Sequence, residues 1–205
     1  MQALSTKTPQ HNLHPLSKRL KLKTHAAHER VDQAIMALSP FASLEGYKRF
    51  LRVQYQFQRH TAPLYEQPEL IELFEGLPQR CRYEAIQRDG KDLSLDLTIT
   101  ELDSVTPPTI SSQAAALGWL YVNEGSNLGA AFLLKYAAQL GLSTNYGARH
   151  LAPSEDGRGL HWRNFVAQLD AVPLTDEQLT QAVTAAGDAF RFVETLAHRA
   201  QDASN

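Results

Sequence analysis

The spacing of apolar residues constrains the fold of this chain more than any other feature of its sequence. Apolar positions recur at helical spacing in at least five segments, and no segment keeps the strict alternation expected of a half-buried strand. With 205 residues, the chain is long enough for one domain with a sizeable core. We therefore predict an all-α, single-domain, multi-helical bundle of roughly six to eight helices. The domain is expected over residues 15–201, after a flexible N-terminal segment at 1–14.

Local capping and breaking signals set the expected helix boundaries. The first helix should begin near Pro15 and stop before Ser39-Pro40, and the second should start at the N-cap Ser43. The sequence T-D-E-Q from Thr175 matches a capping box that opens the last helix. Further helices are predicted at 68–74, 78–88, 113–140 (closed by Gly141) and 160–171, with an irregular crossover at 90–112.

Composition argues against several classes of partner. The formal charge of -2 shows no bias toward nucleic acid or anionic membrane, so neither partner is expected. No apolar run approaches the ~18 residues that span a bilayer, and the N-terminus lacks the apolar segment of a secretory signal. A single cysteine, Cys81, leaves no intrachain disulfide and fits a reducing compartment. A cytoplasmic protein is the resulting expectation.

The long helix expected at 113–140 carries three interior glycines on one face. Gly118, Gly125 and Gly129 are spaced by seven and four residues, and each costs about 1 kcal/mol relative to alanine. Either another helix packs closely on this face, or a flat, rigid ligand lies against it. The polar residues beside the glycines, such as Asn123 and Ser126, favour a site with ordered water.

Histidine is the second feature with a bearing on function. His25 and His28 both lie on the first predicted helix, but only His28 falls on its apolar stripe, so His28 is expected to point at the core. A lone histidine on an apolar face is usually a hydrogen-bonded core residue. The glycine face changes this interpretation, because heme needs a flat slot between one helix that supplies an imidazole and another that offers little bulk.

These segments resemble the bacterial, non-membrane-anchored heme oxygenases. The stretch L-K-T-H-A-A-H-E-R-V resembles the family's proximal helix, and A-L-G-W-L-Y-V-N-E-G-S-N-L-G-A-A-F resembles its distal helix. The segments N-Y-G-A-R-H-L-A-P and H-W-R-N-F-V continue the likeness in order, from about Leu16 to Arg199. The resemblance implies a heme oxygenase-like bundle with heme between the proximal and distal helices and His28 as the axial ligand of the iron.

The resemblance also implies an activity. Heme would be both substrate and cofactor, opened by O2 and electrons from a reductase or ferredoxin-like protein to biliverdin, iron and carbon monoxide, with iron acquisition as the purpose and a monomer as the working form. Gly125, Ser126 and Gly129 would face the ring, and the Gly125 backbone would contact bound oxygen. Arg82 and His150 match positions of the family's distal water network. For Arg82, a surface role is the alternative.

Two further residues bear on which bridge carbon is attacked. Lys21 lies two turns before His28 and Tyr121 one turn before Gly125, so both can reach the heme propionates. A solvated lysine and a core tyrosine are the alternatives. Relatives that open the ring at β and δ carry Asn and Phe at these positions and a lysine where this chain has Met36. The resemblance therefore implies biliverdin IXα.

Other functions remain possible on the sequence alone. A heme carrier or sensor would use the same His28 and glycine face without consuming heme. A helical interaction module would use the glycine face to pack a partner. A di-iron carboxylate protein would need an inward-facing Glu-x-x-His pair, and that motif does not occur in the chain.

Overall fold

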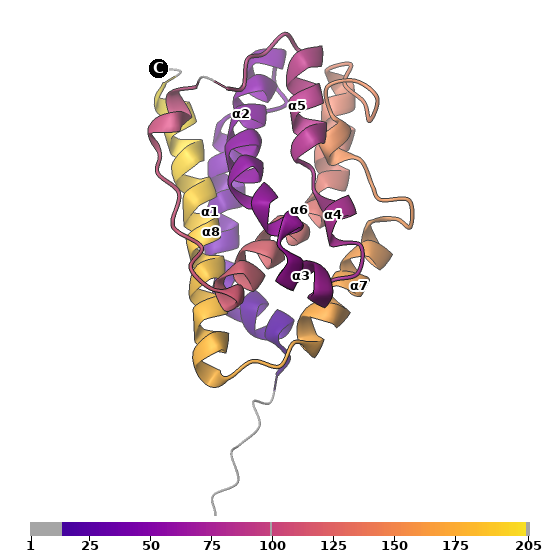
Figure 1. Cartoon of the computed structure of the whole chain (residues 1–205). Helices are drawn as coiled ribbons and strands as arrows, with labels where there is room; N and C mark the ends of the chain where they lie inside the picture. The colour runs from indigo at the N-terminus through magenta and orange to yellow at the C-terminus, as the bar shows by residue number, and fades with distance from the viewer. Residues whose placement is uncertain (1–13, 99, 204–205) are drawn as a thin grey trace, which may run out of the picture.

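Three long helices form the framework of the fold (Figure 1). They are α1 (Leu16–Ala37), α6 (Gln113–Gln139) and α8 (Asp176–Asp202), and α8 packs along both of the others. The structure is a computed structural model and describes residues 14–98 and 100–203. Residues 1–13 of the expected N-terminal segment lie outside that range.

Shorter helices surround this framework. They are α2 (Leu44–Thr61), α3 (Pro68–Leu73), α4 (Leu77–Arg80), α5 (Tyr83–Asp92) and α7 (Arg158–Ala171), with 3-10 turns η1 (Ala62–Glu66), η2 (Glu101–Ser104) and η3 (Arg149–Leu151). Across the described ranges, the only β pairing is a pair of isolated bridges around Ser143. The prediction of an all-α fold is confirmed. None of the helices in the described part is long and apolar enough to cross a membrane.

The core lies where α6 and α8 meet. Buried alanines of α8, including Ala182, Ala186 and Ala189, keep that helix face flat. Gly118 lies opposite, and a Cβ atom placed on it would stand 2.2 Å from the carbonyl oxygen of Ala182. The two backbones therefore approach so closely that only glycine fits, and large side chains such as Trp119 fill the space beside the contact.

The capping signals correctly locate several helix ends. The Ser43 side chain accepts a hydrogen bond from the Gly46 amide, and Thr175 and Gln178 form the predicted capping box. Gly141 follows α6 with a φ of 78°, the left-handed conformation that favours glycine after a helix. Local hydrogen bonding therefore sets these boundaries without help from tertiary contacts.

One predicted helix is wrong. The segment expected as a single helix at 78–88 is divided at Cys81, so that α4 ends at Arg80 and α5 begins at Tyr83. The Cys81 backbone is extended at the break, with ψ 128°, and just before it Arg80 forms an ion pair with the buried Glu124 of α6. The expected crossover starts later than predicted because α5 continues to Asp92, and it contains the short turn η2.

Candidate active site

One face of α6 is open along part of its length. A Cβ atom on Gly129 would have nothing within 4 Å, and one on Gly125 would meet only the Trp162 ring, at 3.6 Å. Phe132 lies on the same face, three residues beyond Gly129, and is 71% exposed. We call Gly125, Gly129 and Phe132 the open stretch of α6. An exposed aromatic side chain one turn from a glycine that nothing covers leaves an apolar surface against which a flat ligand can lie.

The three glycines therefore have two different roles. Gly118 is a packing glycine, in agreement with the explanation that another helix lies close to this face. At Gly125 only the Trp162 ring of α7 comes within contact distance, and nothing lies against Gly129. The close backbone packing seen at Gly118 is therefore absent at these two positions. The ligand explanation remains for this part of the face.

Both candidate histidines of α1 are exposed. The His28 side chain is 59% exposed, and its Nδ1 lies 3.1 Å from a carboxylate oxygen of Asp32. The His25 side chain is 72% exposed and pairs with Glu29. The prediction that His28 points at the core is therefore wrong as stated. His28 lies at the border of the buried stripe, with buried Thr24 one turn before it and an edge-on contact to Phe190 at 5.7 Å between ring centroids.

Beside α6 lies a small, partly open cavity of about 40 Å³ with polar and apolar residues in its wall. It is bounded by α2, α6 and η3, and ten residues line it: Phe50, Gln54, Gln58, Arg82, Ser126, Asn127, Ala130, Leu133, His150 and Leu151. Nε2 of His150 is buried and has no hydrogen-bond partner. A polar cavity of this size with an unpaired nitrogen in its wall suits a few ordered water molecules.

Arg82 lies between this cavity and a cleft on the protein surface. Its side chain lines both the cavity and an outer cleft of about 900 Å³, where Arg80, His161 and Glu155 are among the neighbours. Nε of Arg82 is buried and has no partner in the protein. The interpretation of Arg82 as an ordinary surface residue is therefore not supported, since a solvated guanidinium would not bury this nitrogen.

The sequence and the fold both match known proteins. The family model for heme oxygenase matches residues 14–199. The chain belongs to the heme oxygenase family. It is 43% identical over 197 residues to heme oxygenase PigA of Pseudomonas aeruginosa, covering 96% of this chain and 98% of that protein. The NO- and CO-bound heme oxygenase of Neisseria meningitidis matches with a TM-score of 0.85 and 40% identity, over 91% of this chain and 92% of that one.

The structure of this heme oxygenase brings some predicted site residues together. Arg82, Ser126 and His150 line the same cavity, although they come from separate parts of the chain. Gly125 and Gly129 lie on the adjacent open stretch of α6. These three polar residues thus lie together beside α6.

Two residues lie apart from that cavity. Lys21 is exposed on α1. Tyr121 is partly buried against Trp162, and burial, with a smaller contribution from the charge of Asp170, raises the pKa of its hydroxyl. Asp170 also accepts hydrogen bonds from the amide and hydroxyl of Ser17, at 2.8 and 2.7 Å. Ser17 lies one helical turn before Lys21 on α1, so Asp170 contacts the start of α1 and its charge also acts on Tyr121.

The expectation that Asn123 lies beside ordered water is wrong, because Asn123 and its neighbour Glu124 are both buried against protein partners. The Gln58 amide donates to Oδ1 of Asn123 at 2.6 Å, and Asn123 donates to Thr61 at 2.9 Å. Glu124 is 1% exposed and accepts from Tyr65 and Arg80 at 2.9 and 2.8 Å. This heme oxygenase uses both side chains to fix α6 to α2, η1 and α4, because a buried carboxylate is stable only when it is paired.

Sequence reasoning missed Gln54, Gln58 and Asp89. The two glutamines line the cavity from α2, but glutamine is common on amphipathic helices and gives no signal of its own. Asp89 is fully buried on α5 and contacts His150. In the sequence, Asp89 is only an aspartate three residues after the apolar Ile86, and this pattern does not distinguish a buried aspartate from an exposed one.

Proposed function

We propose that heme binds between α1 and the open stretch of α6, with His28 as the axial ligand of its iron. The observation that carries this proposal is that α6 has nothing against Gly129 and only the Trp162 ring near Gly125, beside an exposed Phe132. A flat apolar ring would cover these surfaces, and burial of apolar area favours its binding. The exposed imidazole of His28 supports the same proposal, because a ligand can reach it without rearrangement of the core.

Heme supplies the iron that activates oxygen, and its own ring is the group that is oxidised. The residues of this chain shape the opposite face of the ring. Gly125 and Gly129 keep side chains away from it, while Arg82 and His150 hold water in the neighbouring cavity. Ser126 donates its hydroxyl hydrogen to the Asn123 carbonyl at 2.7 Å, so its oxygen is left to accept from water.

The alternative of a heme carrier is less well supported. Premature cleavage of the oxygen–oxygen bond would be promoted by an acidic side chain aimed at the oxygen, and the open stretch has none. Glu124, the carboxylate next to Gly125, turns toward Arg80 instead. The hydrogen-bond donors on this side are then water and neutral or cationic side chains of the cavity, such as Gln54 and Arg82. A carrier would hold heme unchanged in reductant and air, whereas an oxygenase would consume it.

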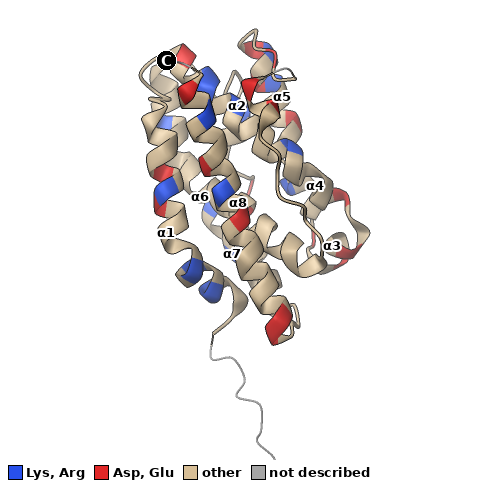
Figure 2. Cartoon of the chain, turned by 90° about the vertical axis from the view of Figure 1, so that its left-hand side faces the viewer, with Lys and Arg blue, Asp and Glu red and all other residues tan. Residues whose placement is uncertain are grey.

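The orientation of the ring is proposed to depend on Lys21 and Tyr121. Basic residues gather at the N-terminal end of α1, where Lys18, Arg19, Lys21 and Lys23 follow one another closely (Figure 2). Asp170 accepts hydrogen bonds from Ser17 at this end of α1, and its charge contributes to the raised pKa of the Tyr121 hydroxyl. A lysine ammonium and a tyrosine hydroxyl at one edge suit the two propionates of heme.

We expect biliverdin IXα as the main product of the wild-type protein. A Lys21→Asn, Tyr121→Phe double variant should shift the product toward other isomers, since both propionate partners are then lost and the ring can rotate in its slot. The measurement is chromatography of the product against isomer standards. A wild-type product that is mainly β or δ would contradict the proposed orientation while leaving ring opening intact.

The remaining expectations concern the cellular setting. The proposed electron donor is a reductase or ferredoxin-like protein, the proposed purpose is iron acquisition, and the proposed working form is a cytoplasmic monomer. The single cysteine supports a reducing compartment. The similarity to a Pseudomonas aeruginosa heme oxygenase supports a bacterial enzyme with the same activity.

A further inference from the structure

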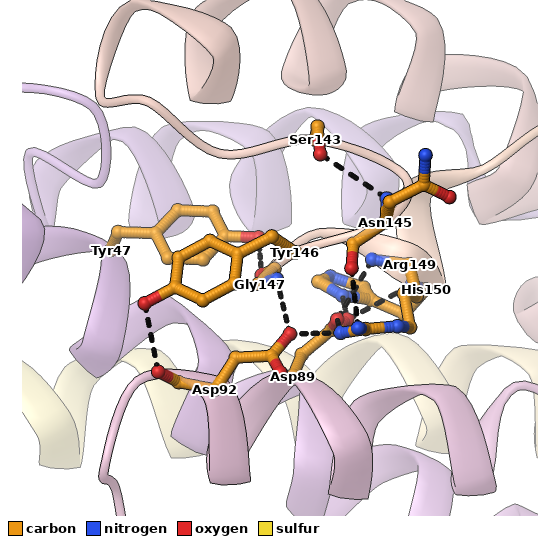
Figure 3. Close-up of polar contacts among 9 residues, drawn as sticks. All are labelled: Tyr47, Asp89, Asp92, Ser143, Asn145, Tyr146, Gly147, Arg149 and His150. Carbon is orange, nitrogen blue, oxygen red and sulfur yellow. Dashed lines mark hydrogen bonds and ion pairs between the residues drawn. The ribbon is translucent and has the colours of Figure 1, made fainter.

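Asp89 is a buried carboxylate that forms the centre of a polar network behind the cavity (Figure 3). Its Oδ1 accepts the Arg149 backbone amide at 2.8 Å and lies 3.3 Å from the Arg149 guanidinium. Its Oδ2 accepts the His150 backbone amide at 3.0 Å and lies 2.8 Å from Nδ1 of the His150 ring. All four neighbours are nitrogen atoms, so this carboxylate holds both the backbone of η3 and the imidazole of His150.

The contact with Asp89 determines which ring nitrogen of His150 carries hydrogen. A carboxylate accepts hydrogen bonds and does not donate them, so Nδ1 must be the protonated nitrogen. Nε2 is then free to accept.

The ring is also fixed in space. His150 is 4% exposed and packs against Phe50, with ring centroids 6.0 Å apart. Nε2 is buried without a protein partner, in a residue that lines the polar cavity. The unpaired nitrogen therefore faces a water-sized space, and a buried acceptor of this kind requires a donor.

We propose that Asp89 is a positioning residue that holds His150 as the Nδ1–H tautomer, so that Nε2 accepts a hydrogen bond from water in the cavity. The proposal rests on the heme position given above. A water that donates one hydrogen to Nε2 has its other hydrogen left to donate toward the open stretch of α6. Asp89 thereby orients the water chain without touching heme, as the outer partners of histidines do in other sites.

The same network contains a matched control. Asp92 lies one turn after Asp89 on α5, and it also pairs with Arg149 and accepts the Gly147 amide at 2.8 Å. Asp92 has no contact with the His150 ring among the described hydrogen bonds. Tyr47 supports the same loop by donating to the Gly147 carbonyl at 2.9 Å, and burial, followed by the charge of Asp89, raises the pKa of its hydroxyl. Loss of Asp92 should therefore weaken the loop without changing the tautomer.

Nitrogen-15 NMR of the histidine rings tests the proposal on the heme-free protein. Wild-type His150, assigned by the signals lost in His150→Gln, should show hydrogen on Nδ1 and none on Nε2. Asp92→Asn should keep this pattern. Asp89→Asn should give a mixture of tautomers or the Nε2–H form, because an amide nitrogen can donate to Nδ1.

Wild-type His150 with hydrogen on Nε2 would overturn the proposal, even if Asp89→Asn fails to fold. In the heme complex, we expect Asp89→Asn to lower kcat roughly tenfold or more with KM for heme nearly unchanged, as for a group that acts on the reacting complex rather than on binding. Asp92→Asn should retain kcat, and equal losses in the two variants would indicate a purely structural role. If the wild-type protein shows the expected tautomer but does not consume heme, the proposed function fails and the tautomer assignment stands.

Discussion

Replacing His28 with alanine is expected to abolish histidine ligation and ring opening together. His28 is the exposed imidazole at the border of the buried stripe of α1, and its loss leaves the iron without the proposed protein ligand. The absorption spectrum of the reconstituted variant should lack the histidine-ligated form, and biliverdin should not appear. Added imidazole should restore the ligated spectrum, since the space left by the side chain is open to solvent.

His25→Ala is the matched control for that experiment. His25 lies one turn earlier on the same helix, is similarly exposed, and pairs with an acidic residue four positions later, as His28 does. This variant should keep both the spectrum and the activity. Normal ligation in His28→Ala together with lost ligation in His25→Ala would show that the wrong histidine had been chosen.

Substituting valine for Gly118 should lower the stability of the protein, whereas substituting valine for Gly129 should weaken heme binding instead. In Gly118→Val, the new side chain would meet the α8 backbone, which a Cβ atom alone would approach to 2.2 Å. Overpacking against backbone should lower the free energy of unfolding by about 3 kcal/mol or more. In Gly129→Val, the side chain enters open space, so unfolding should change by less than about 0.5 kcal/mol while heme affinity falls sharply.

Chemical denaturation of the heme-free variants and heme titration give the two quantities separately. The expected pattern is low stability for Gly118→Val, and near-normal stability with weak heme binding for Gly129→Val. Wild-type heme affinity and turnover in Gly129→Val would place heme elsewhere. Wild-type stability in Gly118→Val would mean that α6 and α8 are not as close as the structure has them.

Much of the fold could be predicted because its determinants are local. Ser43, Thr175 and Gly141 each act within a few residues of a helix end, and each boundary lies where the sequence indicates it. The break at Cys81 has no glycine or proline to mark it in the sequence, and beside it Arg80 pairs with Glu124, 44 positions away along the chain. One sequence does not show contacts between such distant residues.

The candidate site also has features that the sequence predicts and features that only the structure shows. The glycine spacing indicates a shared face, but the separation of Gly118 from Gly129 depends on where α8 lies. The spacing of residues along the helix places His28 near the apolar stripe. It does not separate a buried position from one at the border of the stripe, because the two differ by only a few tens of degrees around the helix axis. Asp89 and His150 come from distant segments, so their contact was accessible only from the structure.

Aerobic turnover of the wild-type protein with heme and a reductant tests the central claim most directly. Heme absorption, iron release, carbon monoxide and bilin are followed in one sample, with a catalase control to remove free peroxide. The account predicts that the heme band disappears and that biliverdin, iron and carbon monoxide form in equal amounts. A protein that binds heme through His28 and keeps it intact through repeated additions of reductant in air would contradict it.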